Sequence, residues 1–174
     1  MNPKAGRYFR PSLVAVIMLT SNLTETPGKG RDREVIMSRH EPDRILVVDD
    51  NSLLRETLAQ KLRDAGYNVI TADRGERAFL ALRDWSHPVD WLYTRANLPG
   101  LVDGWILADE YHDRHPNRAV VITASEARSS RRGDLILKQP SLSSVLDGVR
   151  HVIEADLLRV AAARADADDQ RCAA

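Results

Sequence analysis

Val-Asp-Trp-Leu-Tyr-Thr-Arg-Ala-Asn-Leu-Pro-Gly, residues 89–100, is the stretch that decides the fold. Its apolar first half predicts a buried β-strand that ends at Thr94 or Arg95, and the Pro-Gly pair predicts the turn that follows. In α/β proteins the functional side chains gather where the strands end. Arg95 therefore occupies a position where the chemistry of an α/β domain is expected.

Strands and helices alternate on both sides of this stretch. Further strands are predicted at residues 45–48, 67–72, 119–123 and 134–138, and helices at 52–65, 76–85, 105–115 and from 143 onward. Such alternation is typical of a parallel sheet that helices cover on both faces, with right-handed crossovers. We therefore expect an α/β fold, a flavodoxin-like doubly wound sheet of five parallel strands in the order 2-1-3-4-5.

The connection between the fourth and fifth strands is unusually short. Only ten residues, Ala124 to Gly133, separate these two strands. A loop and one or two helical turns use up that length. We expect a fourth helix that is shortened or missing.

Three regions are expected along the chain. Residues 1–42 contain a short apolar run at 13–19 between basic and polar sequence, and seven apolar residues are too few to span a bilayer, which needs about 20. We expect this segment to be a disordered extension. It could also result from an incorrectly assigned start, since Met37 stands just before the first strand. A signal peptide is a further alternative, but no small-x-small cleavage site follows the apolar run. Residues 43–156 form the expected domain, and 157–174 a helical extension and a disordered tail.

Charge and cysteine content narrow the function classes. Lys and Arg together number 25, and so do Asp and Glu, so the chain lacks the basic excess that attracts nucleic acid or an anionic membrane. Cys172 is the only cysteine, which excludes an internal disulfide and a cysteine metal site. We expect a cytoplasmic protein that recognises its partners through local surface features.

Polar side chains follow four of the predicted strands. They are Asp49 and Asp50, Arg95, Thr123 and Lys138. Because the carboxyl ends of parallel strands meet at one edge of a sheet, these side chains are expected to converge. For the two acids a second interpretation stays open, in which they cap the following helix and complement its dipole.

The motifs around these residues resemble the receiver domains of two-component response regulators. The resemblance covers roughly Arg44 to Ala155, and it rests on Ile-Leu-Val-Val-Asp-Asp-Asn (45–51), Asn-Leu-Pro-Gly (97–100) followed by Asp-Gly-Trp (103–105), Val-Ile-Thr-Ala (121–124) and the lysine of the fifth strand.

The resemblance implies a phosphorylation pocket. In that family the paired acids hold Mg²⁺, an aspartate at the end of the third strand accepts a phosphoryl group from a histidine kinase, and a carbonyl two residues later binds the metal. A hydroxyl residue and a lysine contact the phosphoryl group. Carried over to this sequence, the acids are Asp49 and Asp50, the carbonyl belongs to Asn97, the hydroxyl to Thr123, and the lysine is Lys138.

Arg95 stands at the position of the phosphoacceptor aspartate. A carboxylate can form an acyl phosphate, whereas a guanidinium stays protonated and offers no lone pair. We expect Arg95 to lie against Asp49 and Asp50 as a built-in counterion. The two acids would then be vestigial Mg²⁺ ligands, and we expect no metal or other cofactor in the pocket. Mg²⁺ is expected only if Arg95 does not fill the acidic site, for example if it points to solvent.

Two further departures from the family concern the relay of a signal. Leu135 stands where receivers carry a switch aromatic, and Gln139 follows Lys138 where they carry proline.

A separate group, His112 with His115, has helical spacing that would suit a metal, but an exposed polar helix face is the expected interpretation.

These features favour a stand-alone pseudo-receiver that is not an enzyme and that acts in two-component signalling by phosphorylation-independent protein–protein interaction. Only about 20 residues follow the receiver-like region, too few for a DNA-binding or catalytic output domain, so we expect the chain to act by binding. The expected partner is a histidine kinase, another signalling protein or a second copy. One alternative keeps phosphorylation, on Asp49 or Asp50. The other is a flavodoxin-like protein that binds a small ligand, although no Gly-rich phosphate loop follows any strand.

Overall fold

The computed structural model describes residues 41–126, 130 and 132–172. One sheet contains all five strands of these residues, each paired in parallel with its neighbours, in the order β2-β1-β3-β4-β5. The strands are β1 (Arg44–Val48), β2 (Asn68–Ala72), β3 (Trp91–Arg95), β4 (Val121–Ala124) and β5 (Leu135–Lys138). The predicted flavodoxin-like sheet is confirmed.

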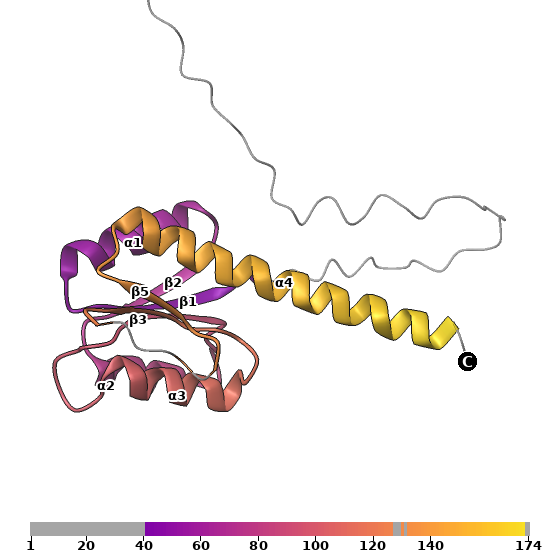
Figure 1. The fold of residues 1–174 in the computed structure, drawn as a ribbon. Coiled ribbons are helices and arrows are strands. Elements are labelled where there is room, and N and C mark those ends of the chain that lie inside the picture. The colour runs from indigo at the N-terminus through magenta and orange to yellow at the C-terminus, as the bar shows by residue number, and fades with distance from the viewer. Residues whose placement is uncertain (1–40, 127–129, 131, 173–174) are drawn as a thin grey trace, which may run out of the picture. The chain divides into compact units, whose positions relative to one another are not determined.

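Helices cover both faces of this sheet. They are α1 (Ser52–Asp64), α2 (Gly75–Leu82), α3 (Gly104–Arg114) and α4 (Leu142–Cys172). Figure 1 shows α1 and α4 on one face and α2 and α3 on the other. Side-chain caps fix where two of them begin, because Asn51 accepts the backbone N–H of Leu54 and Asp103 accepts that of Trp105.

Strand alternation divides the core between the two faces. On β1, Ile45 and Val47 pack toward α1 and α4, whereas Leu46 and Val48 pack toward α2 and α3. Tyr93 of β3 lies in register with Val47 and belongs to the same face. The alternation matters for the site, because it decides which polar residues at the strand ends share a face.

The connection from β4 to β5 contains no helix among its described residues, which are 125, 126, 130 and 132–134. This agrees with the prediction of a fourth helix that is shortened or missing, and the label α4 belongs to the C-terminal helix. The prediction for the second helix was too long, because α2 ends at Leu82 rather than at Trp85.

The predictions for the two ends of the chain have different outcomes. The predicted N-terminal extension lies outside the described residues, except for positions 41 and 42. At the other end α4 continues past the sheet to Cys172, in the region 157–174 where the sequence predicts a helical extension and a disordered tail (Figure 1). In the described part of the chain, no helix has the length and apolar character needed to cross a membrane.

Candidate functional site

The candidate site lies at the carboxyl edge of the sheet, where β1, β3, β4 and β5 end. Arg95 is in register with Thr123, and Ala124 with Lys138, while Asp49 directly follows β1. Topology thus brings together residues that lie far apart in the sequence. Alternation places Asp49, Tyr93 and Thr123 on the same face of the sheet as Val47 and Val121.

Arg95 forms an ion pair with Asp50. Its Nη1 donates to Oδ1 of Asp50 at 2.6 Å, and 45% and 39% of the two side chains are exposed. A charge-assisted hydrogen bond of this length holds the guanidinium directly against one acid of the pair. Arg95 therefore contacts one of its two predicted partners and does not simply point to solvent.

Asp49 has different partners. The residue is 3% exposed, its Oδ2 accepts the hydroxyl of Tyr93 at 2.9 Å, and its Oδ1 accepts the backbone N–H of Asn51 at 2.9 Å. The interpretation of the acids as helix caps is wrong, because the side chain that caps α1 is that of Asn51. Both oxygens of Asp49 are thus engaged inside the protein.

Tyr93 also reaches Thr123. Its hydroxyl oxygen lies 3.4 Å from Oγ1 of Thr123, and since its single hydrogen goes to Asp49, Thr123 is the donor in this contact. Burial, followed by the negative charge of Asp49, raises the pKa of the Tyr93 hydroxyl well above its ordinary value. Tyr93 therefore keeps its proton and remains a hydrogen-bond donor.

The remaining predicted residues are Asn97 and Lys138, and only one of them lines the cavity at this edge. Asn97 is exposed and lines a cavity of about 250 Å³ that also borders Asp49, Arg95 and Thr123. Lys138 is exposed as well, and the described residues that line this cavity do not include it. The sheet edge therefore gathers five of the six predicted residues around the cavity and the ion pair beside it.

The residue after Lys138 explains part of this difference. Gln139 adopts a left-handed conformation with φ of 40°, and its backbone N–H donates to the carbonyl of Ala124 at 3.2 Å. Gln139 and Pro140 line the cavity at the end of β5. Gln139, rather than Lys138, thus lies at the cavity wall.

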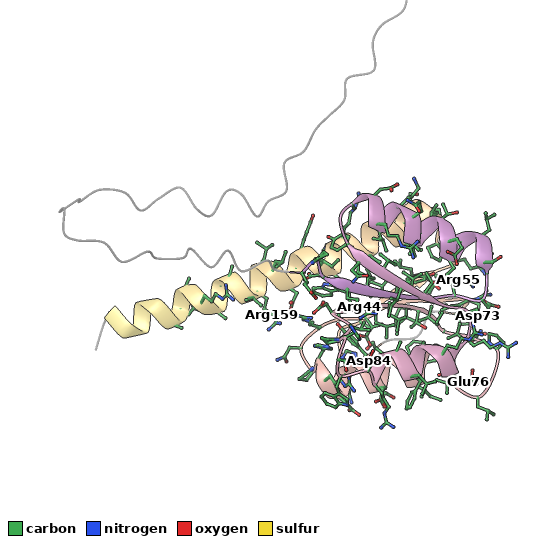
Figure 2. All side chains as sticks on the ribbon, turned by 180° about the vertical axis from the view of Figure 1, so that it is seen from behind. Arg44, Arg55, Asp73, Glu76, Asp84 and Arg159 are labelled. Atoms are coloured by element: carbon green, nitrogen blue, oxygen red, sulfur yellow. The ribbon has the colours of Figure 1, made fainter. Side chains whose placement is uncertain are left out.

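Two residues that support the site were not predicted. One is Tyr93, although its position two residues before Arg95 on a strand was a signal that it shares a face with the strand-end residues. The other is Arg55 of α1, whose Nη1 donates to the backbone carbonyl of Asp49 at 2.8 Å. Figure 2 shows Arg55 on the α1 side of the sheet. Its place on a helix gave no such signal.

A metal cluster elsewhere was weighed for His112 and His115. In the ranges that the structure describes, no three His, Cys, Asp or Glu side chains lie together in a way that would hold an ion. His112 was expected on an exposed polar helix face, but it is buried and pairs with Asp134 at 2.8 Å between Nε2 and Oδ1. The expectation of an exposed face was therefore wrong for His112.

Removing the Arg95 side chain should hardly change stability. Exposed ion pairs contribute up to about 1 kcal/mol, so Arg95→Ala is expected to lower the free energy of unfolding by no more than about that amount. Urea unfolding followed by circular dichroism measures it. Arg77→Ala is a matched control, because Arg77 forms an exposed pair with Asp73 at 3.2 Å. A loss of several kcal/mol for Arg95→Ala alone would show that Arg95 is needed for folding.

One sequence relative matches part of the chain at moderate identity. The chain is 36% identical over 83 residues to the transcriptional regulatory protein AruR of Pseudomonas aeruginosa, an alignment that covers 46% of this chain and 34% of AruR. The chain thus spans about a third of the length of that relative.

Solved structures match along nearly their whole length. A response regulator receiver protein from Sinorhizobium medicae has a TM-score of 0.60 at 24% identity, covering 66% of this chain and 97% of that protein. The response regulator TrrA of Thermotoga maritima, solved with Mg²⁺ and BeF, has a TM-score of 0.51 at 25% identity, covering 63% and 98%.

The family assignment rests on the sequence between β1 and β5. The model of the response regulator receiver domain family matches residues 45–138, which include Asp49, Asp50, Thr123 and Lys138. This chain therefore belongs to the response regulator receiver domain family of two-component signalling.

Proposed function

We propose that this chain is a pseudo-receiver, which acts in two-component signalling by binding other proteins without being phosphorylated. The observation that carries the proposal is the 2.6 Å ion pair between Arg95 and Asp50. Arg95 is the last residue of β3, and the resemblance to the family assigns the phosphoacceptor to this position. Three chemical arguments support the proposal.

The first argument concerns the nucleophile. Phosphoryl transfer to a receiver needs a carboxylate oxygen that attacks phosphorus and keeps the group as an acyl phosphate. The guanidinium of Arg95 is protonated at every accessible pH and has no lone pair for this attack. With Arg95 at the end of β3, the usual covalent step has no acceptor atom.

The second argument concerns the metal. Mg²⁺ binds through carboxylate oxygens and tolerates little deviation from octahedral geometry. Asp50 is neutralised by Arg95, and both oxygens of Asp49 already accept hydrogen bonds. These residues do not fit Mg²⁺, and the proposal therefore includes no metal cofactor.

The third argument concerns the relay. Leu135 of β5 stands at the switch position and packs, half-buried, against the core on the face of α1 and α4. The hydroxyl of Thr123, which would contact a phosphoryl group, is already in contact with Tyr93. Neither residue is free to report a change in the pocket, so a fixed binding surface accounts for the arrangement better than a switch does.

The proposed partners follow from the family. A histidine kinase, another signalling protein or a second copy of the chain would recognise the receiver fold in one conformation. An affinity measured for any such partner is expected to be the same with and without phosphodonor. Regulation would then come from the amount of protein present rather than from its chemical state.

Incubation with acetyl phosphate and Mg²⁺ tests the proposal. Intact-mass spectrometry is expected to find the unchanged chain, because Arg95 cannot accept the phosphoryl group. Calorimetric titration is expected to detect no Mg²⁺ binding in the millimolar range. A chemotaxis-type receiver that becomes phosphorylated under the same conditions serves as the positive control.

The competing function retains phosphotransfer on Asp49 or Asp50. It predicts a mass increase of one phosphoryl group, which peptide mapping would locate at one of these two residues. Such an adduct would overturn the proposed phosphorylation-independent function. Asp50→Asn should then abolish the adduct if Asp50 is the acceptor and leave it intact if Asp49 is.

A further inference from the structure

We propose that Tyr93 is a second internal lock on the pocket, a positioning residue that holds Asp49 and Thr123 away from metal and phosphoryl ligands independently of Arg95. The inference deepens the proposed pseudo-receiver function and rests on it. It goes beyond that function by predicting that Arg95→Asp will not by itself restore a site that binds Mg²⁺ fully.

The lock is built from three contacts in the buried half of the pocket. The hydroxyl of Tyr93 donates to Oδ2 of Asp49 at 2.9 Å and accepts from Thr123 at 3.4 Å, while the N–H of Asn51 donates to Oδ1 of Asp49 at 2.9 Å. Tyr93 is fully buried and Asp49 almost so, at 0% and 3% exposure. Water therefore competes little for these hydrogen bonds.

Sheet geometry explains why a tyrosine can do this. Tyr93 lies in register with Val47 and Val121, so Asp49 and Thr123 each stand two residues further along a neighbouring strand, on the same face. Side chains on strands lean along the strand direction, and the length of a tyrosine side chain spans this offset. A shorter aliphatic residue at this position would reach neither Asp49 nor Thr123.

The two locks act on different acids. Arg95 neutralises Asp50 from the exposed side, and Tyr93 fixes the orientation of Asp49 from the buried side. For Asp49 to turn toward a metal, the hydrogen bond from Tyr93 must break, and Mg²⁺ accepts only near-octahedral ligand positions. Hydrogen bonds to a carboxylate also offset part of the charge that attracts a cation. Removing Arg95 therefore leaves one acid restrained.

The test compares Mg²⁺ binding among four folded proteins by calorimetric titration. These are the unchanged chain, Arg95→Asp, Arg95→Asp with Tyr93→Phe, and Arg95→Asp with Tyr111→Phe. The Tyr93→Phe change keeps the buried ring and removes only the hydroxyl. We expect the variant that combines it with Arg95→Asp to bind Mg²⁺ at least about tenfold more tightly than Arg95→Asp alone.

Tyr111→Phe is the matched control. Tyr111 is also a buried tyrosine, but its hydroxyl donates to the backbone carbonyl of Asp90 at 2.5 Å, on the opposite face of the sheet. Loss of a buried hydroxyl should lower stability in both double variants, whereas only loss of the Tyr93 hydroxyl should raise Mg²⁺ affinity. A merely structural role for Tyr93 would not produce that difference.

The outcomes separate the two proposals. Equal affinities of Arg95→Asp and its Tyr93→Phe double variant, or no binding by either, would overturn the role of Tyr93. An equal gain in Mg²⁺ affinity in the variant that combines Arg95→Asp with Tyr111→Phe would overturn it too. Such a gain would show that the loss of any buried tyrosine hydroxyl raises the affinity. Mg²⁺ binding or phosphorylation of the unchanged chain would instead overturn the proposed function.

Discussion

Replacing Gly104 by alanine is expected to lower the free energy of unfolding by about 3 kcal/mol and to disturb the backbone that carries Arg95. Gly104 begins α3 and packs directly against the end of β3. A Cβ atom there would lie 2.2 Å from the carbonyl oxygen of Arg95 and 2.9 Å from Cα of Ala96. These atoms belong to the backbone at the end of a central strand and just after it, so the clash cannot be relieved by turning a side chain.

Chemical denaturation of the variant measures this effect, and Gly148→Ala is its control. Gly148 lies in α4, where an added Cβ would be 3.0 Å from Cδ2 of Leu135 and 3.1 Å from Cδ1 of Leu137, both ends of flexible side chains. Alanine also has the higher helix propensity, which offsets part of this crowding. Equal losses for the two variants would show that contact with the strand backbone is not what makes Gly104 necessary.

The architecture was predictable because it follows from periodicity. Continuous apolar runs such as residues 45–48, each followed by a polar end and a helical pattern, leave little choice other than a parallel doubly wound sheet. The convergence of Asp49, Arg95 and Thr123 at one edge then follows from topology. The family resemblance had the same origin, because its motifs are those strand ends.

The pairing inside the site was predictable only in part. Charge alone suggested that Arg95 would contact both acids, but alternation turns Asp49 toward the buried face, where Tyr93 is its partner, and leaves Asp50 on the exposed side. Likewise, the conformation that Gln139 adopts decides which residue lines the cavity at the end of β5. Such choices depend on atomic distances, which a sequence pattern does not contain.

His112 shows a different limit. Its position near the end of α3, beside charged residues, is typical of an exposed face, yet it is buried and pairs with Asp134, which directly precedes β5. The carboxylate of Asp134 accepts from three places at once: His112, the backbone N–H of Val120 at 2.9 Å, and the hydroxyl of Ser130 at 2.6 Å. This network joins α3 to the β4–β5 connection.

Asp134→Ala is therefore expected to be strongly destabilising, by about 3 kcal/mol, because it leaves the N–H of Val120 and the ring of His112 buried without their acceptor. Urea unfolding at neutral pH measures the loss. Asp134→Asn is the control, since its side-chain oxygen can still accept the N–H of Val120. A loss for the alanine variant no larger than that of the asparagine variant would show that the network contributes only through the charge.

The pH dependence of the same variant provides an independent check. Burial alone would raise the pKa of Asp134, but hydrogen bonds from His112, Ser130 and Val120 outweigh it and lower the pKa below the ordinary value of 3.8. A carboxyl group with a lowered folded-state pKa stabilises the fold fully above its unfolded-state pKa, and this contribution disappears as the pH falls through the folded-state pKa. The difference in unfolding free energy between the unchanged chain and Asp134→Ala should therefore stay constant at neutral pH and shrink below pH 3.8. A difference that stayed constant through this acidic range would contradict a stabilising role for the ionised carboxylate and would leave only the shape of the side chain to explain the network.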